Sequence, residues 1–93
     1  MLPGFEWNEQ KAQVNLSKHG VSFAEATTVF DDPQCLFMDD PKHSIGESRF
    51  LILGYSVVER LLLVVHCDRG NTIRIIGARP ATLSERRSYE QGC

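Results

Sequence analysis

Apolar residues in the first third of the chain recur with the period of helices. Asn8 can cap a helix over residues 9–19, because an asparagine side chain accepts a hydrogen bond from the first helical turn. Gly20 is typical of the residue that follows a helix. The segment Ser22–Glu25 has the form of a capping box and predicts a second helix that ends near residues 31–33. The sequence therefore predicts an N-terminal helical hairpin.

Beyond this hairpin, short apolar runs separated by polar turns are typical of strands. Four strands are expected, over residues 34–39, 49–56, 60–68 and 72–79. Pro80 ends the fourth strand, and a second capping box over Thr82–Glu85 predicts a C-terminal helix through Tyr89. Since consecutive strands are joined by short turns, we predict a four-stranded antiparallel sheet. The fold class is α+β, with helices that cover one sheet face.

Length limits this architecture to one domain, expected over residues 1–93. Hydrophobic residues make up 42% and charged residues 24% of the chain, values that are ordinary for a folded globular protein. The apolar runs are far shorter than the roughly 20 residues that span a bilayer, so no membrane segment is predicted. The N-terminal residues lack the basic and apolar regions of a signal peptide, and the expected location is the cytoplasm.

Charge is unevenly distributed, although the net charge is only −2. Residues 1–47 carry eight acidic residues and three lysines, whereas residues 48–93 carry four acidic residues and seven arginines. The planar guanidinium group fits phosphate and carboxylate, so the arginines of residues 48–93 indicate a site that binds anions. Ordinary exposed arginines on strands explain the same pattern equally well. The negative net charge argues against strong binding of RNA, because such binding depends on positive charges that neutralise the phosphates.

Cysteine and histidine patterns indicate neither a disulfide framework nor a metal site. The three cysteines are an odd number without C-x-x-C spacing, and reduced thiols are expected. A Cys–His catalytic pair is discarded because Cys67 follows His66 on a predicted strand, where neighbouring side chains point to opposite faces. We interpret His66 as a hydrogen-bonded, half-buried histidine. The three histidines are scattered, so no metal and no other cofactor is expected.

Several charged residues have the chemistry to cleave an RNA phosphodiester without a metal. The reaction needs a base for the 2′-hydroxyl, cations for the developing charge and an acid for the leaving oxygen. Glu47 and Arg49 are two residues apart on an extended segment and are expected to share a face. Lys18 and His19 end a helix, where positive charge also has a purely stabilising role. Composition alone does not choose between catalysis and simple anion binding.

Two further arginines, Arg74 and Arg79, lie on the fourth predicted strand at a separation of five residues. Strict alternation would place them on opposite faces of the sheet. A bulge near Gly77 would redirect Arg79 to the face of Arg74. The sequence leaves both arrangements open.

Taken in order, several segments make the chain similar to the BrnT family of type II toxin–antitoxin toxins. The resemblance covers nearly the whole chain, and its strength lies in the order and spacing of the segments. The matching segments include Phe5–Asn8, Lys18–Phe23, Val29–Pro33, Gly46–Phe50, Arg74–Arg79 and Glu85–Glu90. Departures are Asn8, where the family usually has an acid, and Gly77, where it commonly has serine; the glycine is expected to loosen the strand beside Arg79.

The resemblance implies a RelE-like fold and a ribonuclease that arrests growth by degrading RNA. It also implies neutralisation by a BrnA-like antitoxin, similar to ribbon-helix-helix proteins, through which the pair contacts operator DNA. The alternative is a catalytically weak module that binds the antitoxin and acts as a co-repressor of its own operon. The residues carried over to the candidate site are Lys18, His19, Glu47, Arg49, Arg74 and Arg79.

Chemistry then suggests a role for most of these residues. Arg74 and Arg79 are expected to contact phosphate and the transition state. Glu47 is the expected base, and His19 or Lys18 the expected proton donor.

Overall fold

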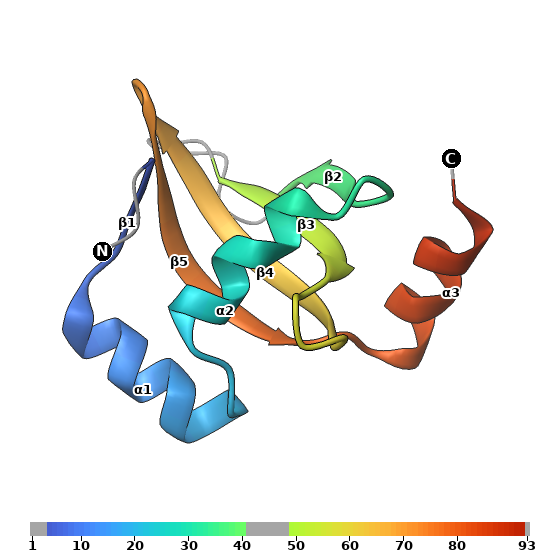
Figure 1. Ribbon diagram of the computed structural model, residues 1–93, viewed down its shortest axis with the longest axis horizontal. Helices are drawn as coiled ribbons and strands as arrows, with labels where there is room; N and C mark the ends of the chain where they lie inside the picture. Colours follow the sequence, from blue (N-terminus) through green and yellow to red (C-terminus); the bar gives the residue numbers. More distant parts are fainter. Residues whose placement is uncertain (1–3, 41–48, 93) are drawn as a thin grey trace.

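The computed structural model describes residues 4–40 and 49–92, which form one sheet with helices around it (Figure 1). The strand order across the sheet is β1-β5-β4-β3-β2. The strands are β1 Phe5–Glu6, β2 Leu36–Asp39, β3 Phe50–Tyr55, β4 Leu61–Arg69 and β5 Thr72–Pro80. The helices are α1 Glu9–His19, α2 Phe23–Thr28, the 3-10 turn η1 Val29–Asp31 and α3 Leu83–Gln91. Among these residues, no helix combines the length and the apolar character needed to cross a membrane.

Strand β1 corrects the predicted four-stranded antiparallel sheet. It pairs in parallel with β5, with Phe5 opposite Ile73 and Glu6 opposite Arg74, so the sheet has five strands and is mixed. The other four strands are antiparallel, as predicted. A two-residue strand carries no alternation that sequence can display, and its partner lies almost 70 residues further along the chain. Only the packing of the folded domain brings β1 against β5.

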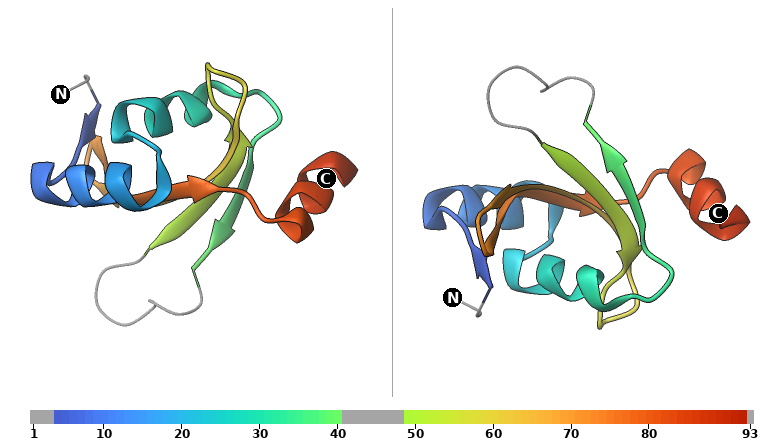
Figure 2. Two further views of the ribbon diagram at one scale, coloured as in Figure 1. Left: turned by 90° about the horizontal axis from the view of Figure 1, so that it is seen from below. Right: turned by 90° about the horizontal axis from the view of Figure 1, so that it is seen from above.

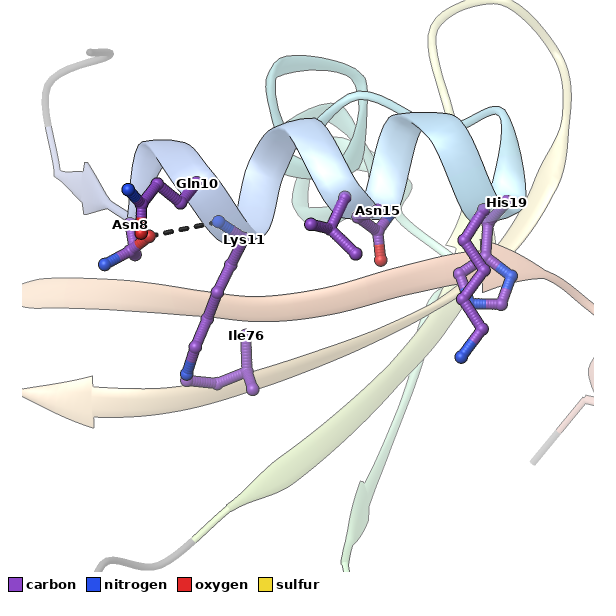
Figure 3. Close-up of a pocket in the computed structure, with 8 residues that line it drawn as sticks. Asn8, Gln10, Lys11, Asn15, His19 and Ile76 are labelled. Atoms are coloured by element: carbon purple, nitrogen blue, oxygen red, sulfur yellow. Dashed lines mark hydrogen bonds between the residues drawn. The ribbon is translucent and has the colours of Figure 1, made fainter.

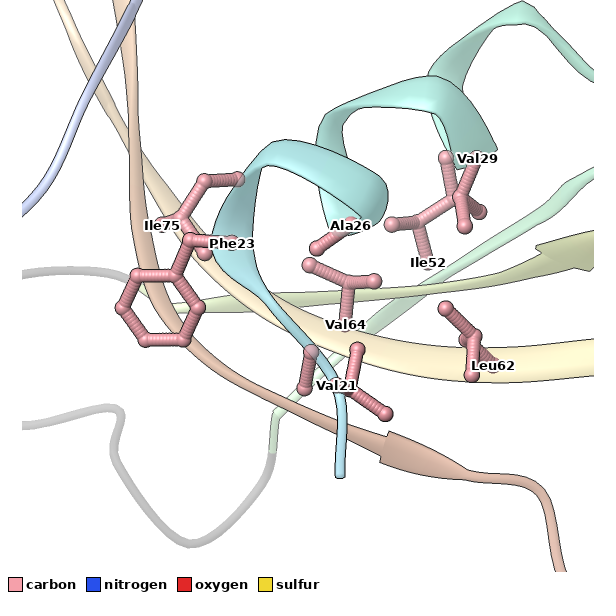
Figure 4. Packing of buried hydrophobic residues seen from close by; sticks show 9 residues of the cluster. Val21, Phe23, Ala26, Val29, Ile52, Leu62, Val64 and Ile75 are labelled. Carbon is pink, nitrogen blue, oxygen red and sulfur yellow. The ribbon is translucent and has the colours of Figure 1, made fainter. Parts of the chain in front are cut away.

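The two N-terminal helices do not cover the sheet equally. Figure 2 shows α2 on one face of the sheet and α1 beside β5. Side chains from α2 and η1 fill the main core, where Phe23, Ala26 and Val29 meet Ile52 and Val64 (Figure 4). We call this the helix face. The expectation that both helices pack on one face therefore holds for α2, whereas α1 packs mainly along β5.

Helix capping follows the predicted pattern with one exception. Asn8 accepts a hydrogen bond from the Lys11 N–H, and Thr82 forms a complete capping box with Glu85. Ser22 accepts the N–H of Glu25, but the Glu25 carboxylate does not return to Ser22, so the predicted capping box is only half formed. That carboxylate instead binds the guanidinium of Arg60, whose Nε donates to it over 3.0 Å. The hydrogen bond from Arg60 lowers the pKa of Glu25.

A bulge in β5 decides where its side chains point. His66 is opposite Ile75 and Val65 is opposite Gly77, which leaves Ile76 without a partner on β4. The extra residue shifts the alternation of the strand by one position. As a result Arg74 and Arg79, opposite Cys67 and Leu63, lie on the same face of the sheet. We call this the arginine face. The sequence did not decide whether β5 has a bulge, and the structure shows that it does.

Helix α3 lies against the arginine face through side chains that remain partly exposed, and none of its residues is fully buried. The Tyr89 hydroxyl donates to Asp32 Oδ2 over 2.6 Å, and the Tyr55 N–H donates to the same oxygen over 2.8 Å. Burial would raise the pKa of Asp32, but the hydrogen bonds from Tyr89, Tyr55 and Gln34 lower it. Burial and the bond to Asp32 raise the pKa of Tyr89 to about 12. The hydroxyl therefore remains a donor at neutral pH.

His66 contradicts the expectation of a hydrogen-bonded histidine. Its side chain is buried on the helix face among the rings of Phe30, Phe37 and Phe50. Neither ring nitrogen has a hydrogen-bond partner among the described residues. Burial lowers the pKa of His66, and the carboxylate of Asp68, 4.0 Å from Nδ1, opposes this shift only in part. The imidazole is neutral at pH 7.

This buried imidazole is expected to make the protein less stable as the pH falls below 6.5. The unfolded chain, with a histidine pKa near 6.5, binds a proton that the folded state resists, so the free energy of unfolding decreases by at most about 1.4 kcal/mol per pH unit. Urea unfolding of the protein and of His66→Leu between pH 7 and pH 5 measures the effect. The slope should be absent in the variant, and an equal slope in both proteins would assign it to other groups. Carboxylates with lowered pKa values, such as Glu25 and Asp32, contribute only at lower pH.

Candidate functional site

A hollow lies between α1 and the bulged part of β5. Its volume is about 480 Å³, within the range of pockets that bind small ligands. The residues that line it are Asn8, Gln10, Lys11, Val14, Asn15, Lys18, His19 and Ile76. Figure 3 shows Lys11 extending from α1 across β5 towards Ile76, with His19 at the other end of the hollow. Two of the predicted site residues, Lys18 and His19, which are consecutive in the chain, line this hollow.

Asn15 fixes the distance between α1 and β5. Its side-chain amide donates to the Ala78 carbonyl over 2.8 Å and to the Val21 carbonyl over 2.9 Å. Its oxygen accepts the Ala78 N–H over 3.1 Å. The two bonds to Ala78 satisfy backbone groups of β5 beyond the part that pairs with β1, and the third satisfies a carbonyl of the connection between α1 and α2. The helix bearing Lys18 is therefore held at a fixed place beside the strand that bears Arg79.

The two arginines of β5 lie on one face but are held at different ends of the sheet. Arg74 donates to Glu6 on β1 over 2.7 Å. Arg79 makes a bidentate pair with Glu85 at the start of α3, with both bonds 2.8 Å long. Their partners on β4 are four residues apart, which separates the two backbone positions by roughly 13 Å. The structure therefore places them on a common surface without joining them in one cluster.

The ion pairs set the electrostatics of this surface. The hydrogen bond from Arg79 lowers the pKa of Glu85, and the same bond raises the pKa of Arg79. Both side chains are thus charged at neutral pH, and the guanidinium group is held in a defined position. Anions that bind Arg79 must share it with Glu85 or displace this carboxylate.

The remaining predicted pair is described only in part. Arg49 directly precedes β3, and alternation from Phe50, which shares the helix face with His66, places it on the arginine face. Glu47 lies outside the described residues, so its predicted role stays a prediction. Within the residues that the structure describes, no group of three or more histidine, cysteine or acidic side chains is arranged to hold a metal ion.

Sequence reasoning missed Lys11 and Ile76. Lys11 precedes Lys18 by seven residues, which is two helical turns, so the spacing alone predicts that both side chains share one face of α1. Ile76 carries no such signal, because only the register between β4 and β5 shows that it is the extra residue of the bulge.

Comparisons with known proteins support the fold and show the family. A family model described as the ribonuclease toxin BrnT of type II toxin–antitoxin systems matches residues 7–85. Among solved structures, the chain is similar to the BrnT ribonuclease toxin of Brucella abortus, with 22% identity and a TM-score of 0.64 over 84% of this chain and 95% of that chain. No curated protein matches the sequence. Since the family model covers most of the chain, the protein belongs to the BrnT family of ribonuclease toxins of type II toxin–antitoxin systems.

Proposed function

We propose that this protein is a metal-independent endoribonuclease of the cytoplasm that arrests growth when its antitoxin is absent. The observation that carries the proposal is that α1 and β5, which pack side by side, carry four of the six candidate site residues. Lys18 and His19 line the hollow, while Arg74 and Arg79 lie on the adjoining strand. Phosphate binding and stabilisation of developing negative charge both need such cations.

The proposed reaction is attack by a ribose 2′-oxygen on the adjacent phosphorus. Glu47, as base, takes the proton of the 2′-hydroxyl while the new P–O bond forms. The bond from phosphorus to the 5′-oxygen breaks, and that oxygen receives a proton from His19 or Lys18. The products are a 2′,3′-cyclic phosphate and a free 5′-hydroxyl. Arg74 and Arg79 would leave Glu6 and Glu85 and converge from the two ends of β5 on the phosphate oxygens, whose charge increases in the transition state.

Removal of metal is expected to leave this activity intact. Purified protein should cleave RNA at the same rate in EDTA as in magnesium, because the nucleophile is activated by a side chain and not by a metal-bound base. Cleavage is followed on a labelled RNA, and the ends are identified by mass spectrometry. Products with 2′,3′-cyclic phosphate support the mechanism, whereas magnesium dependence with 3′-hydroxyl ends contradicts it.

A specific observation favours the alternative, in which the chain is a weak enzyme and mainly a co-repressor. Glu6 and Glu85 neutralise both candidate phosphate-binding arginines in the isolated chain. Expression without antitoxin separates the two functions: growth arrest selects the nuclease, and normal growth combined with antitoxin-dependent repression selects the co-repressor.

The proposed partner is a BrnA-like ribbon-helix-helix antitoxin that covers the arginine face and carries the contact with operator DNA. Covering this face inhibits by occlusion, and acidic side chains of the antitoxin would complement it. Hydrogen exchange should then show protection around Arg74 and Arg79 in the complex, and operator binding should require the antitoxin. Protection confined to other surfaces, or tight operator binding by this chain alone, would reject the model.

A further inference from the structure

We infer that the hollow between α1 and β5 binds one unpaired nucleotide of a single-stranded RNA. Its base would lie against Val14 and Ile76, and its neighbouring phosphates would lie beside Lys11 and Lys18. The inference rests on the proposed nuclease function and names the part of the substrate that the hollow holds. It adds Lys11, Val14 and Ile76 to the residues that contact RNA.

The shape of the hollow follows from the bulge and from Asn15. The bulge moves Ile76 out of register with β4, and Asn15 bonds to Ala78 two residues further along the strand. α1 is thereby fixed beside the strand, and space of about 480 Å³ remains between them. This space is defined by buried hydrogen bonds and therefore exists before the ligand arrives.

The wall of the hollow includes apolar surface that the fold leaves unused. Val14 is 63% exposed although it belongs to a helix that packs against the sheet. Ile76, also a lining residue, is only partly buried. A flat nucleobase is a suitable occupant for such a wall, because its faces are apolar while its edges form hydrogen bonds. Bases reach a site of this kind only when they are unpaired and splayed from their neighbours.

The charge around this wall fits a phosphate backbone. Lys11 and Lys18 are seven residues apart, which is about 10.5 Å along the helix axis, and both line the hollow. The described lining residues include no carboxylate. Glu9, the acidic residue of the first turn, accepts a hydrogen bond from Trp7 Nε1 over 2.9 Å and is not part of the lining. The cations thus flank the apolar wall without competition from an acid within it.

The probe for this site is a short 2′-O-methyl RNA, which binds but cannot be cleaved because its nucleophile is blocked. Nuclear magnetic resonance should show amide shifts on α1 and at residues 75–77. Val14→Glu, which places a carboxylate in the hollow, should weaken binding about tenfold. Leu16→Glu is the matched control, because Leu16 is 51% exposed on the same helix and does not line the hollow.

A second pair of variants tests the phosphate contact. Lys11→Ala should lower the affinity and reduce the slope of log affinity against log salt by about 0.7. Arg87→Ala removes the same charge from the exposed surface of α3 and should leave that slope unchanged. A duplex of the same sequence should bind more weakly than the single strand, because its bases are not available to the hollow.

The inference is overturned if Val14→Glu and Leu16→Glu weaken RNA binding equally, or if the amide shifts lie away from the hollow. Loss of antitoxin binding with unchanged RNA binding would instead assign the hollow to the antitoxin. Cleavage assays separate this inference from the proposed function. If the unmodified protein cleaves RNA and Val14→Glu cleaves it equally well, the nuclease stands and the nucleotide site fails. If the protein binds the 2′-O-methyl RNA in the hollow but cleaves no RNA, the nuclease proposal fails instead.

Discussion

Replacing Arg79 by alanine is expected to slow RNA cleavage on the order of a hundredfold, and Arg74→Ala is expected to do the same. A cation aimed at the charge that develops on the phosphate contributes about 3 kcal/mol to the stability of the transition state. The measurements are the initial rate of RNA cleavage and the growth of cells that express each variant without antitoxin. Both variants should lose growth inhibition.

Arg87→Ala is the control for these two variants, because it removes an arginine from the exposed surface of α3. The stability of the Arg79 variant should change little, since the Arg79–Glu85 pair is partly exposed and such pairs contribute little to folding. Thermal melting checks this expectation. Full toxicity of both variants would falsify the assignment of the two arginines.

Asn15→Ala is expected to lower the free energy of unfolding by about 3 kcal/mol. The side chain makes three hydrogen bonds to buried backbone groups of Val21 and Ala78, and its removal leaves those groups without partners. A domain of this size has little stability to lose, so the effect should be large in urea unfolding. Gln13→Ala, on the exposed side of the same helix, is the control.

A loss as small as that of the control would show that water replaces the Asn15 side chain without cost. The expected loss would also affect the hollow, because the same bonds position α1 against β5. Weaker binding of the 2′-O-methyl RNA by Asn15→Ala, at a temperature where the variant is folded, would connect the stability of this contact with the site.

Charge is arranged in space differently from its arrangement along the chain. The sequence separates an acidic half from an arginine-rich half. In the fold, α1 brings Lys11 and Lys18 of the acidic half alongside β5, the strand that carries Arg74 and Arg79 of the other half. Acidic residues such as Asp39 lie on β2, at the opposite edge of the sheet. A negative net charge is therefore compatible with a local cationic surface.

The sequence by itself determined the α+β class and almost all the helices and strands. Asn8, Ser22 and Thr82 start their helices as predicted, because capping depends on a side chain and the N–H groups of the next turn. Strands β2 to β5 begin and end within two residues of the expected limits. The family resemblance, confirmed by the family model, likewise depends on the order of short segments along the chain.

Tertiary structure alone decided the features that build the candidate site. The parallel pairing of β1, the extra residue at Ile76 and the ion pair of Arg79 with Glu85 all depend on contacts between packed elements. The Glu25 carboxylate shows the same effect, because Arg60 binds it and prevents the complete capping box that its local sequence favours. Local patterns determine where elements begin and end, because hydrogen bonds within one turn are sufficient for that. Which side chains meet across the sheet depends on register, and register is selected by the packing of the whole domain.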